Sequence, residues 1–179
     1  MKLVETILEN MTISFSGRIN VLSEQSKQFI GSVVLSEGQL VDARFGKMSG
    51  KKALATLLMK ERSSISMSLV SEPELVSEVE FSFNMDEQGF FKFKNDYFEQ
   101  YELLSKLRPS KNLVLGLNSR KLDIYTPLTD LEFDAMKLVL SCKNVEEMYD
   151  KTQMLEFDVT KSLISLRKKG IILVKGTAS

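Results

Sequence analysis

The sequence predicts a mixed α+β chain: a small antiparallel sheet with helices, an aromatic connecting helix and a winged-helix-like module of three helices. Three observations predict this class. Strand-like stretches fill the first part of the chain, helical periodicity dominates the second, and Pro73, Pro109 and Pro127 fall between the periodic segments. We therefore divide the chain into an N-terminal α+β module (1–82), a connecting helix and linker (83–126) and a C-terminal module (127–179).

The first module should contain an antiparallel sheet. Three stretches mix β-branched and aromatic residues with polar ones, as half-buried strands do: Thr12–Ile19, Gln28–Leu35 and Gln39–Phe45. The short segment Ser36–Gly38 joins the last two and has the composition of a hairpin turn. We expect these two strands to pair as a β-hairpin.

A helix and a further strand complete this module. Ser49 is a natural N-cap for a helix over Gly50–Lys60, whose apolar face contains Ala53, Leu54, Leu57 and Leu58. The stretch Ser63–Val70 then alternates Ile65, Met67 and Leu69 with serines. Alternation with a period of two predicts a half-buried strand.

The connecting region carries an aromatic helix over Asn84–Arg108. Its stripe at helical spacing consists of Phe90, Phe93, Tyr97, Tyr101 and Leu104, with Phe91 and Phe98 beside it. So large an apolar stripe must be covered. It could pack between the two modules or form the face of a homodimer, and we favour packing within the chain.

The last module has three helical patterns followed by a strand. The patterns cover Leu131–Leu140, Val145–Thr152 and Val159–Leu166. Gly170 is placed to end the third helix, and Ile171–Val174 is a short apolar strand. This order predicts a winged-helix-like module.

The composition argues against most enzymatic chemistry. Among 179 residues there are 24 basic and 24 acidic side chains, so no overall field favours DNA, an anionic membrane or an acidic substrate. The absence of histidine removes the commonest general base and metal ligand. Chemistry based on carboxylates, lysine or oxygen-bound metal stays open in principle. We expect a protein that is not an enzyme and uses no cofactor and no metal.

The same composition bears on the compartment. The single cysteine, Cys142, excludes an internal disulfide and lies in an apolar stretch where we expect it to be buried. The first residues alternate charge and apolar side chains too quickly for a signal peptide. No apolar run approaches the roughly 20 residues of a membrane span. These features predict a cytoplasmic protein without membrane insertion.

The segment Gly46–Lys52 has the glycines and lysines of a phosphate loop but not their spacing. Three residues rather than four separate its glycines, and Lys52 stands where a Ser or Thr would bind magnesium. We interpret it as a strand-to-helix turn and reject nucleotide hydrolysis.

Three segments of the first module resemble the bacterial PATAN (PatA N-terminus) domain family over roughly residues 10–80: Ser16–Ile19, Gly31–Ala43 and Gly50–Leu58. The resemblance implies a non-catalytic signalling adaptor found beside response-regulator receivers and in polarity, gliding and motility systems. Similar proteins often carry a winged-helix-like segment, which Leu155–Leu166 and Lys169–Ile172 fit. It therefore implies protein–protein interaction in two-component signal transduction or cell polarity.

Basic residues cluster where the third strand meets the first module's helix. We predict partner binding by Arg44, Lys47, Lys51 and Lys52, with Lys60 and Arg62 nearby. Such a surface would suit an acidic partner, such as the pocket face of a receiver domain or a small GTPase. The alternative interpretation is an ordinary solvated helix face.

The alternative function is a transcriptional regulator that binds DNA through the winged-helix-like module. Its third helix and the residues after it supply the basic candidates, Lys161, Arg167, Lys168 and Lys169. From Pro127 onward, however, eight basic residues face eight acidic ones, and little chain follows Val174 to form a second wing strand. Because binding to phosphates needs a net positive face, we expect DNA not to be the partner.

Overall fold

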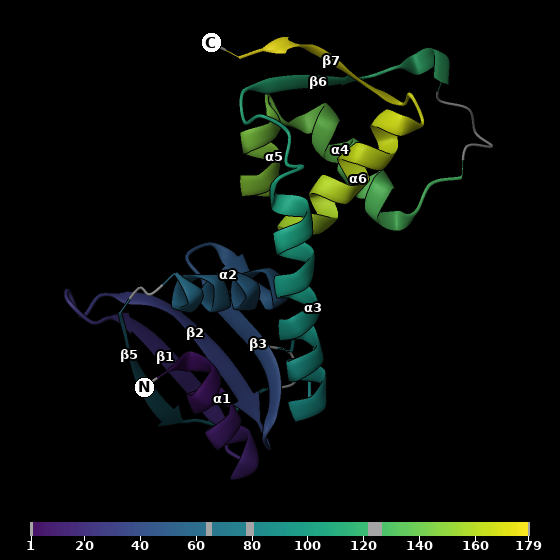
Figure 1. The fold of residues 1–179 in the computed structure, drawn as a ribbon. Helices are drawn as coiled ribbons and strands as arrows, with labels where there is room; N and C mark the ends of the chain where they lie inside the picture. Colours follow the sequence, from purple (N-terminus) through teal and green to yellow (C-terminus); the bar gives the residue numbers. More distant parts are fainter. Residues whose placement is uncertain (1, 64–65, 78–80, 122–126, 179) are drawn as a thin grey trace. The chain divides into compact units, whose positions relative to one another are not determined.

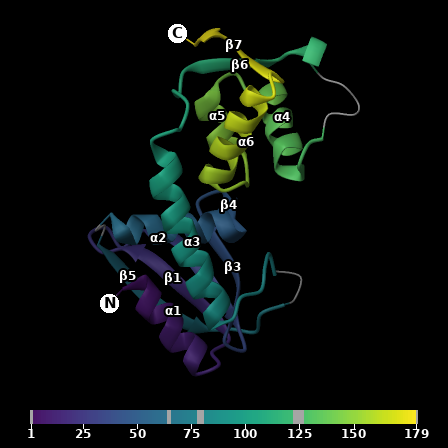
Figure 2. The same cartoon turned by 45° about the vertical axis from the view of Figure 1, so that its right-hand side comes forward.

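The computed structural model describes residues 2–63, 66–77, 81–121 and 127–178. The chain folds into two compact units, Met1–Phe98 and Glu99–Ser179. Both combine helices with antiparallel strands (Figures 1 and 2), so the predicted α+β class is confirmed.

The N-terminal unit contains one antiparallel sheet with helices against it. The strands are β1 (Gly17–Ser23), β2 (Phe29–Ser36), β3 (Gln39–Phe45), β4 (Met48–Ser49) and β5 (Met67–Pro73), in the order β4-β3-β2-β1-β5. The helices are α1 (Leu3–Thr12) and α2 (Gly50–Arg62). Their apolar faces share one core with the strands, which buries Ile7 and Leu57 beside Val33 completely.

The β2–β3 hairpin forms where the turn composition predicts it. Glu37 and Gly38 both have positive φ, 49° and 76°, the conformation of a tight two-residue turn that fits the twist of paired strands. A Cβ at position 38 would lie 2.7 Å from the backbone oxygen of Met11. This turn therefore requires glycine both for its conformation and for the close approach of α1.

Two element boundaries differ from the sequence prediction. The strand expected over Thr12–Ile19 begins at Gly17, because residues up to Thr12 belong to α1, which the sequence analysis missed. The strand expected over Ser63–Val70 is β5, which starts at Met67. Its expected residues 64 and 65 lie outside the described part of the chain.

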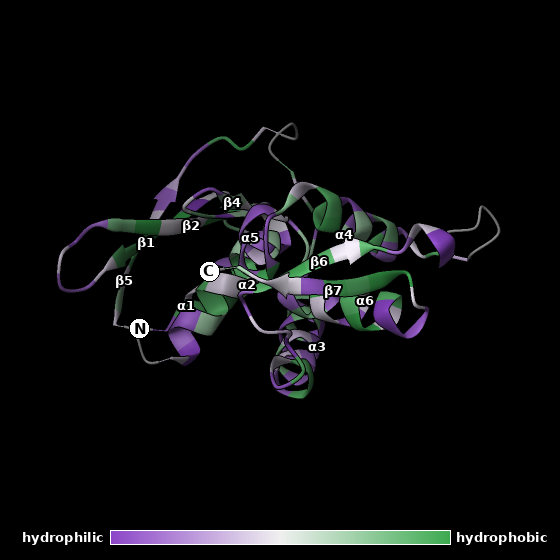
Figure 3. Ribbon diagram, turned by 90° about the horizontal axis from the view of Figure 1, so that it is seen from above, coloured by the Kyte–Doolittle hydropathy of each residue, from purple (hydrophilic) through white to green (hydrophobic). Residues whose placement is uncertain are grey.

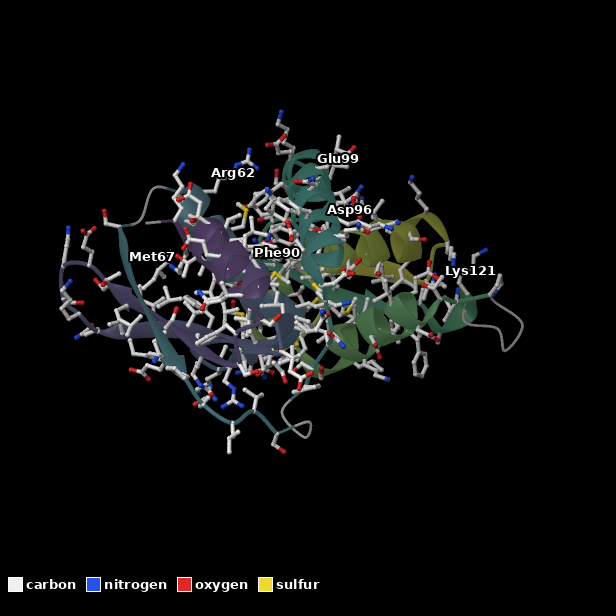
Figure 4. The ribbon with its side chains drawn as sticks, turned by 90° about the horizontal axis from the view of Figure 1, so that it is seen from below. Arg62, Met67, Phe90, Asp96, Glu99 and Lys121 are labelled. Carbon is white, nitrogen blue, oxygen red and sulfur yellow. The ribbon has the colours of Figure 1, made fainter. Side chains whose placement is uncertain are left out.

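The aromatic helix is α3 (Glu87–Ser105), and its first half belongs to the N-terminal unit. Phe90 is fully buried in that unit's core, with Phe93 and Phe98 packed against it. In Figure 4 Phe90 lies among packed side chains, whereas Arg62 lies at the margin. The predicted boundaries at 82/83 and 126/127 therefore differ from the observed division at 98/99, because the connecting region divides its side chains between two cores.

The C-terminal unit places three helices beneath a two-stranded sheet. The helices are α4 (Asp130–Ser141), α5 (Val145–Lys151) and α6 (Glu156–Lys168); a 3-10 turn, η2, covers Ser119–Lys121. The sheet pairs β6 (Leu113–Leu117) with β7 (Ile172–Thr177), side by side in Figure 3. The prediction of three helices and a final strand is correct, but β6 was assigned to the linker. Among the described residues no strand follows β7, so its partner precedes the helices.

A buried carboxylate joins the first and last helices of this unit. Glu132 accepts hydrogen bonds from Thr129 N (2.8 Å), Ser165 Oγ (2.6 Å) and Lys169 Nζ (2.8 Å). Burial by itself would raise the pKa of this carboxyl, but these donors and the charge of Lys169 outweigh burial and lower the pKa from 4.5 to about 2. Glu132 is therefore ionised and ties the start of α4 to the end of α6.

Candidate functional site

The predicted partner-binding residues lie around the junction of β3, β4 and α2. Lys47 lies in the turn between β3 and β4, Lys51 lies in the first turn of α2, and both are exposed. Arg44 lies on β3 with half of its side chain exposed. Lys52, in contrast, is only 6% exposed. A residue so buried cannot belong to a docking surface, so Lys52 is removed from the predicted set.

A buried aspartate fixes the backbone of this junction. Asp42 is 2% exposed, and its Oδ1 accepts hydrogen bonds from Gly50 N (3.2 Å) and Ser82 Oγ (2.6 Å). Gly50 has φ +67°, a left-handed conformation that glycine adopts without strain. Asp42 thus satisfies the first N–H of α2. Ser49 occupies the predicted N-cap position, but its side chain makes no capping hydrogen bond.

Arg44 is oriented by the same aspartate. Its Nε donates to Asp42 Oδ2 at 3.3 Å. The Asp42 carboxylate is buried, whereas half of the arginine side chain stays exposed. The ion pair therefore fixes the Nε atom of Arg44, while part of the side chain stays at the surface.

The two remaining cations of the region contact aromatic rings. Lys60 Nζ lies 5.2 Å from the centre of the Phe45 ring, and the Arg62 guanidinium lies 4.9 Å from that of Phe98. Such contacts attach a cation to the protein's own surface. We call Arg44, Lys47 and Lys51 the exposed basic face; the sequence predicted these three, but not the burial of Lys52.

The four basic candidates for DNA binding differ in whether the protein itself binds their charged groups. Lys161, Arg167 and Lys168 are exposed on α6. Lys169 is engaged internally, with Nζ 2.8 Å from the Glu132 carboxylate and donating to the Pro127 carbonyl at 2.9 Å. Three of the four candidates can therefore reach a ligand.

The C-terminal unit separates its basic and acidic residues into different segments, which the sequence analysis did not predict. Leu103–Lys121 and Val159–Ser179 contain no Asp or Glu, and each contains five Lys or Arg. The pairing of β6 with β7 brings the two segments together. The equal numbers of basic and acidic residues from Pro127 onward hide this separation. That range excludes the first segment and includes the acidic helices α4 and α5.

No metal centre or membrane-spanning helix is found in the described part of the chain. There, no group of three or more Cys, Asp or Glu side chains is placed to bind a metal ion, and no helix has the length and apolarity needed to cross a membrane. Cys142, expected to be buried, is only half-buried at the end of α4.

The fold and site define a class: a two-unit α+β protein with an exposed cationic face beside a strand-to-helix junction. A scan against protein-family models gave no match, and searches of curated proteins and of solved structures gave none either. The similarity to PATAN domains therefore remains a prediction.

Proposed function

We propose that this protein is a non-enzymatic signalling adaptor that binds an acidic surface of another protein through Arg44, Lys47 and Lys51. The observation that carries the proposal is the exposure of these three cations around one strand-to-helix junction. Asp42 fixes the backbone of that junction through its hydrogen bond with Gly50 N. Cations displayed on a fixed backbone speed encounter with an acidic partner. The PATAN resemblance supports the same kind of role.

The partner classes that we propose are response-regulator receivers and small GTPases of polarity or motility systems. A receiver presents an acidic pocket, which is the complement of a small cationic face. Contacts of this kind at the rim of an interface affect mainly the association rate and its salt dependence. The proposed mechanism is therefore electrostatically steered docking in the cytoplasm.

The test is a double charge reversal, Lys47→Glu with Lys51→Glu, compared with Lys27→Glu with Lys92→Glu. All four lysines are exposed, and both variants change the net charge equally. The immobilised full chain is used to capture proteins from the native cell, and each captured protein is then purified and titrated against all three chains. We expect the first variant to bind about tenfold more weakly at low salt and the control to bind like wild type.

One result would contradict the proposal. Equal affinity of both variants for every captured protein would exclude the exposed basic face as the docking surface. Circular dichroism must show the same helix content in all three chains, and a normal spectrum with lost binding assigns the loss to the surface itself.

DNA binding is the alternative function, and the exposure of Arg167 and Lys168 favours retaining it as a second candidate. A duplex-retardation assay at low salt tests it, because phosphate contacts give an affinity that falls steeply with salt. Salt-sensitive retardation that Arg167→Glu abolishes would support a regulator. Absence of retardation would remove this candidate.

A further inference from the structure

Strand β7 has a free edge. Asn118 N donates to the carbonyl of Ile171 at 2.7 Å, and the antiparallel register continues through Leu117↔Ile172 to Leu115↔Val174. Backbone groups alternate in direction along such a strand, so Ile172 and Val174 direct their N–H and C=O groups away from β6. Among the described residues no third strand pairs there. An edge of this kind is a template for a further strand.

A hollow runs along this edge. It has a volume of about 150 Å³, and three consecutive residues of β7, Ile172–Val174, line it. Leu163 and Ile164 of α6 also line it, as do Leu113 and Leu115 of β6 and Leu107 and Pro109 before that strand. Leu173 and Val174 are 41% and 44% exposed. The hollow thus lies between α6 and the two-stranded sheet and includes residues of the unpaired strand β7, an arrangement that can take an extended chain and one of its apolar side chains.

The charge that lines the hollow is positive. Arg167 is the only charged residue that lines it among the described residues. Lys168, which is also exposed, follows Arg167 at the end of α6. Arg108 and Lys111, before β6, pair instead with Glu156 and Glu146 of the same unit.

We propose that the β7 edge and this hollow form a docking groove for an extended acidic segment of a partner protein. The segment would pair with the backbone of Ile172 and Val174 and insert one large apolar side chain into the hollow. Its flanking Asp or Glu side chains would contact Arg167 and Lys168. The groove is in the C-terminal unit and is independent of the exposed basic face.

The same charges disfavour a second copy of this chain as the occupant. Pairing of two β7 strands would bring together two copies of Arg167, Lys168 and Lys175 with no acidic residue in either strand or in the last turn of α6. Like charges placed opposite each other are destabilising. The apolar lining and the strand edge also suit a polypeptide better than a phosphate backbone, which needs a surface rich in hydrogen-bond donors.

The probe is a phage-displayed library of linear twelve-residue peptides, selected on the immobilised full-length protein. Enriched sequences are made as fluorescent peptides and titrated by anisotropy. We expect enrichment of a large apolar residue flanked by Asp or Glu. Binding should fall about tenfold in Arg167→Glu with Lys168→Glu, and remain unchanged in the Lys27→Glu, Lys92→Glu control.

Two further variants test the groove itself. Val174→Pro removes an N–H that points away from β6, so it should weaken peptide binding without breaking a bond of the β6–β7 ladder. Ile164→Trp should fill the hollow and weaken the same peptides. Circular dichroism identifies a misfolded variant, and either variant that folds suffices as the test.

Several outcomes would overturn this proposal. They are the failure to enrich any peptide, enrichment of peptides without acidic residues, or equal binding to the charge-reversed groove. A wild-type dimer in sedimentation that becomes a monomer on Val174→Pro would assign the edge to a second copy. Retention of duplex DNA that is lost in the charge-reversed groove would assign it to nucleic acid. These variants leave the exposed basic face unchanged. A negative result for the groove therefore does not contradict the proposed function.

Discussion

Replacement of Glu132 by glutamine should destabilise the C-terminal unit strongly. The side chain of Glu132 is 6% exposed and that of Lys169 is 32% exposed. Glutamine keeps the shape and one accepting oxygen, but its amide NH₂ group would face donors that now bind a carboxylate. The change therefore removes a charge and leaves at least one buried donor without an acceptor.

The magnitude follows from the pKa of Glu132. A fall from 4.5 to about 2 corresponds to about 3 kcal/mol of preferential stabilisation of the charged form. Solvent at Lys169, which is one-third exposed, reduces this figure, so we expect a loss of about 2–3 kcal/mol. Lys169→Met should cost about as much or more, because it leaves a buried carboxylate without its cation.

Hydrogen exchange read by mass spectrometry can localise the effect within the full chain. Peptides from α4 and α6 should exchange roughly 30- to 150-fold faster in Glu132→Gln at pH 7, and peptides from α2 should not change. Glu147→Gln is the matched control, since Glu147 also pairs with a lysine (Lys151 Nζ at 2.6 Å) but at the surface. If α4 and α6 exchanged at the same rate in both variants, the assignment of Glu132 as the tie between these helices would be wrong.

The pH dependence gives an independent check. Because the pKa of Glu132 is lower in the folded state, its contribution is complete above about pH 4.5 and is lost as the pH falls towards 2. The difference in free energy of unfolding between wild type and Glu132→Gln should shrink through this window, as measured by urea denaturation at several pH values. A difference that stayed constant from pH 7 to pH 2 would contradict the mechanism.

Three further changes test the N-terminal unit, each by urea denaturation followed by circular dichroism. Phe90→Ala should cost about 3–5 kcal/mol, because it leaves a cavity in a fully buried site; a cost below about 1 kcal/mol would place Phe90 outside the core. Gly38→Ala should cost about 1–3 kcal/mol, since φ is +76° and the new Cβ would clash with the Met11 carbonyl; a neutral effect would refute this turn geometry. Asp42→Asn should cost about 1–3 kcal/mol, and a stability unaffected by it would show that its carboxylate does not hold the start of α2.

Local patterns predicted most of the elements, and the missed ones have identifiable causes. The β2–β3 hairpin, α2 and the helices of the C-terminal unit follow from turn composition and periodicity. Helix α1 was missed although its buried residues Leu3, Ile7 and Met11 are four residues apart, the spacing of one helix face. Strand β6 was missed because a five-residue apolar run containing Gly116 lies between prolines and has no hairpin partner in sequence.

The neighbour of Gly116 on β7 is distant in sequence. A Cβ at Gly116 would lie 2.0 Å from the Lys175 side chain, which crosses it from β7, 59 positions along the chain. No local pattern reveals such a contact. The same holds for Lys52, which follows Lys51 in sequence but is buried while its neighbour is exposed.

The neutral overall charge of the chain hides how its charges are arranged. Interactions between exposed charges fade beyond about 8 Å at physiological salt, so a partner responds to the local surface and not to the sum over the chain. Arg44, Lys47 and Lys51 give one such exposed basic group, and Arg167 and Lys168 at the end of α6 give another. The two surfaces have no residue in common, and each lies within one unit. If both proposed surfaces bind a partner, charge reversal in one unit should therefore abolish one interaction while the other keeps its affinity.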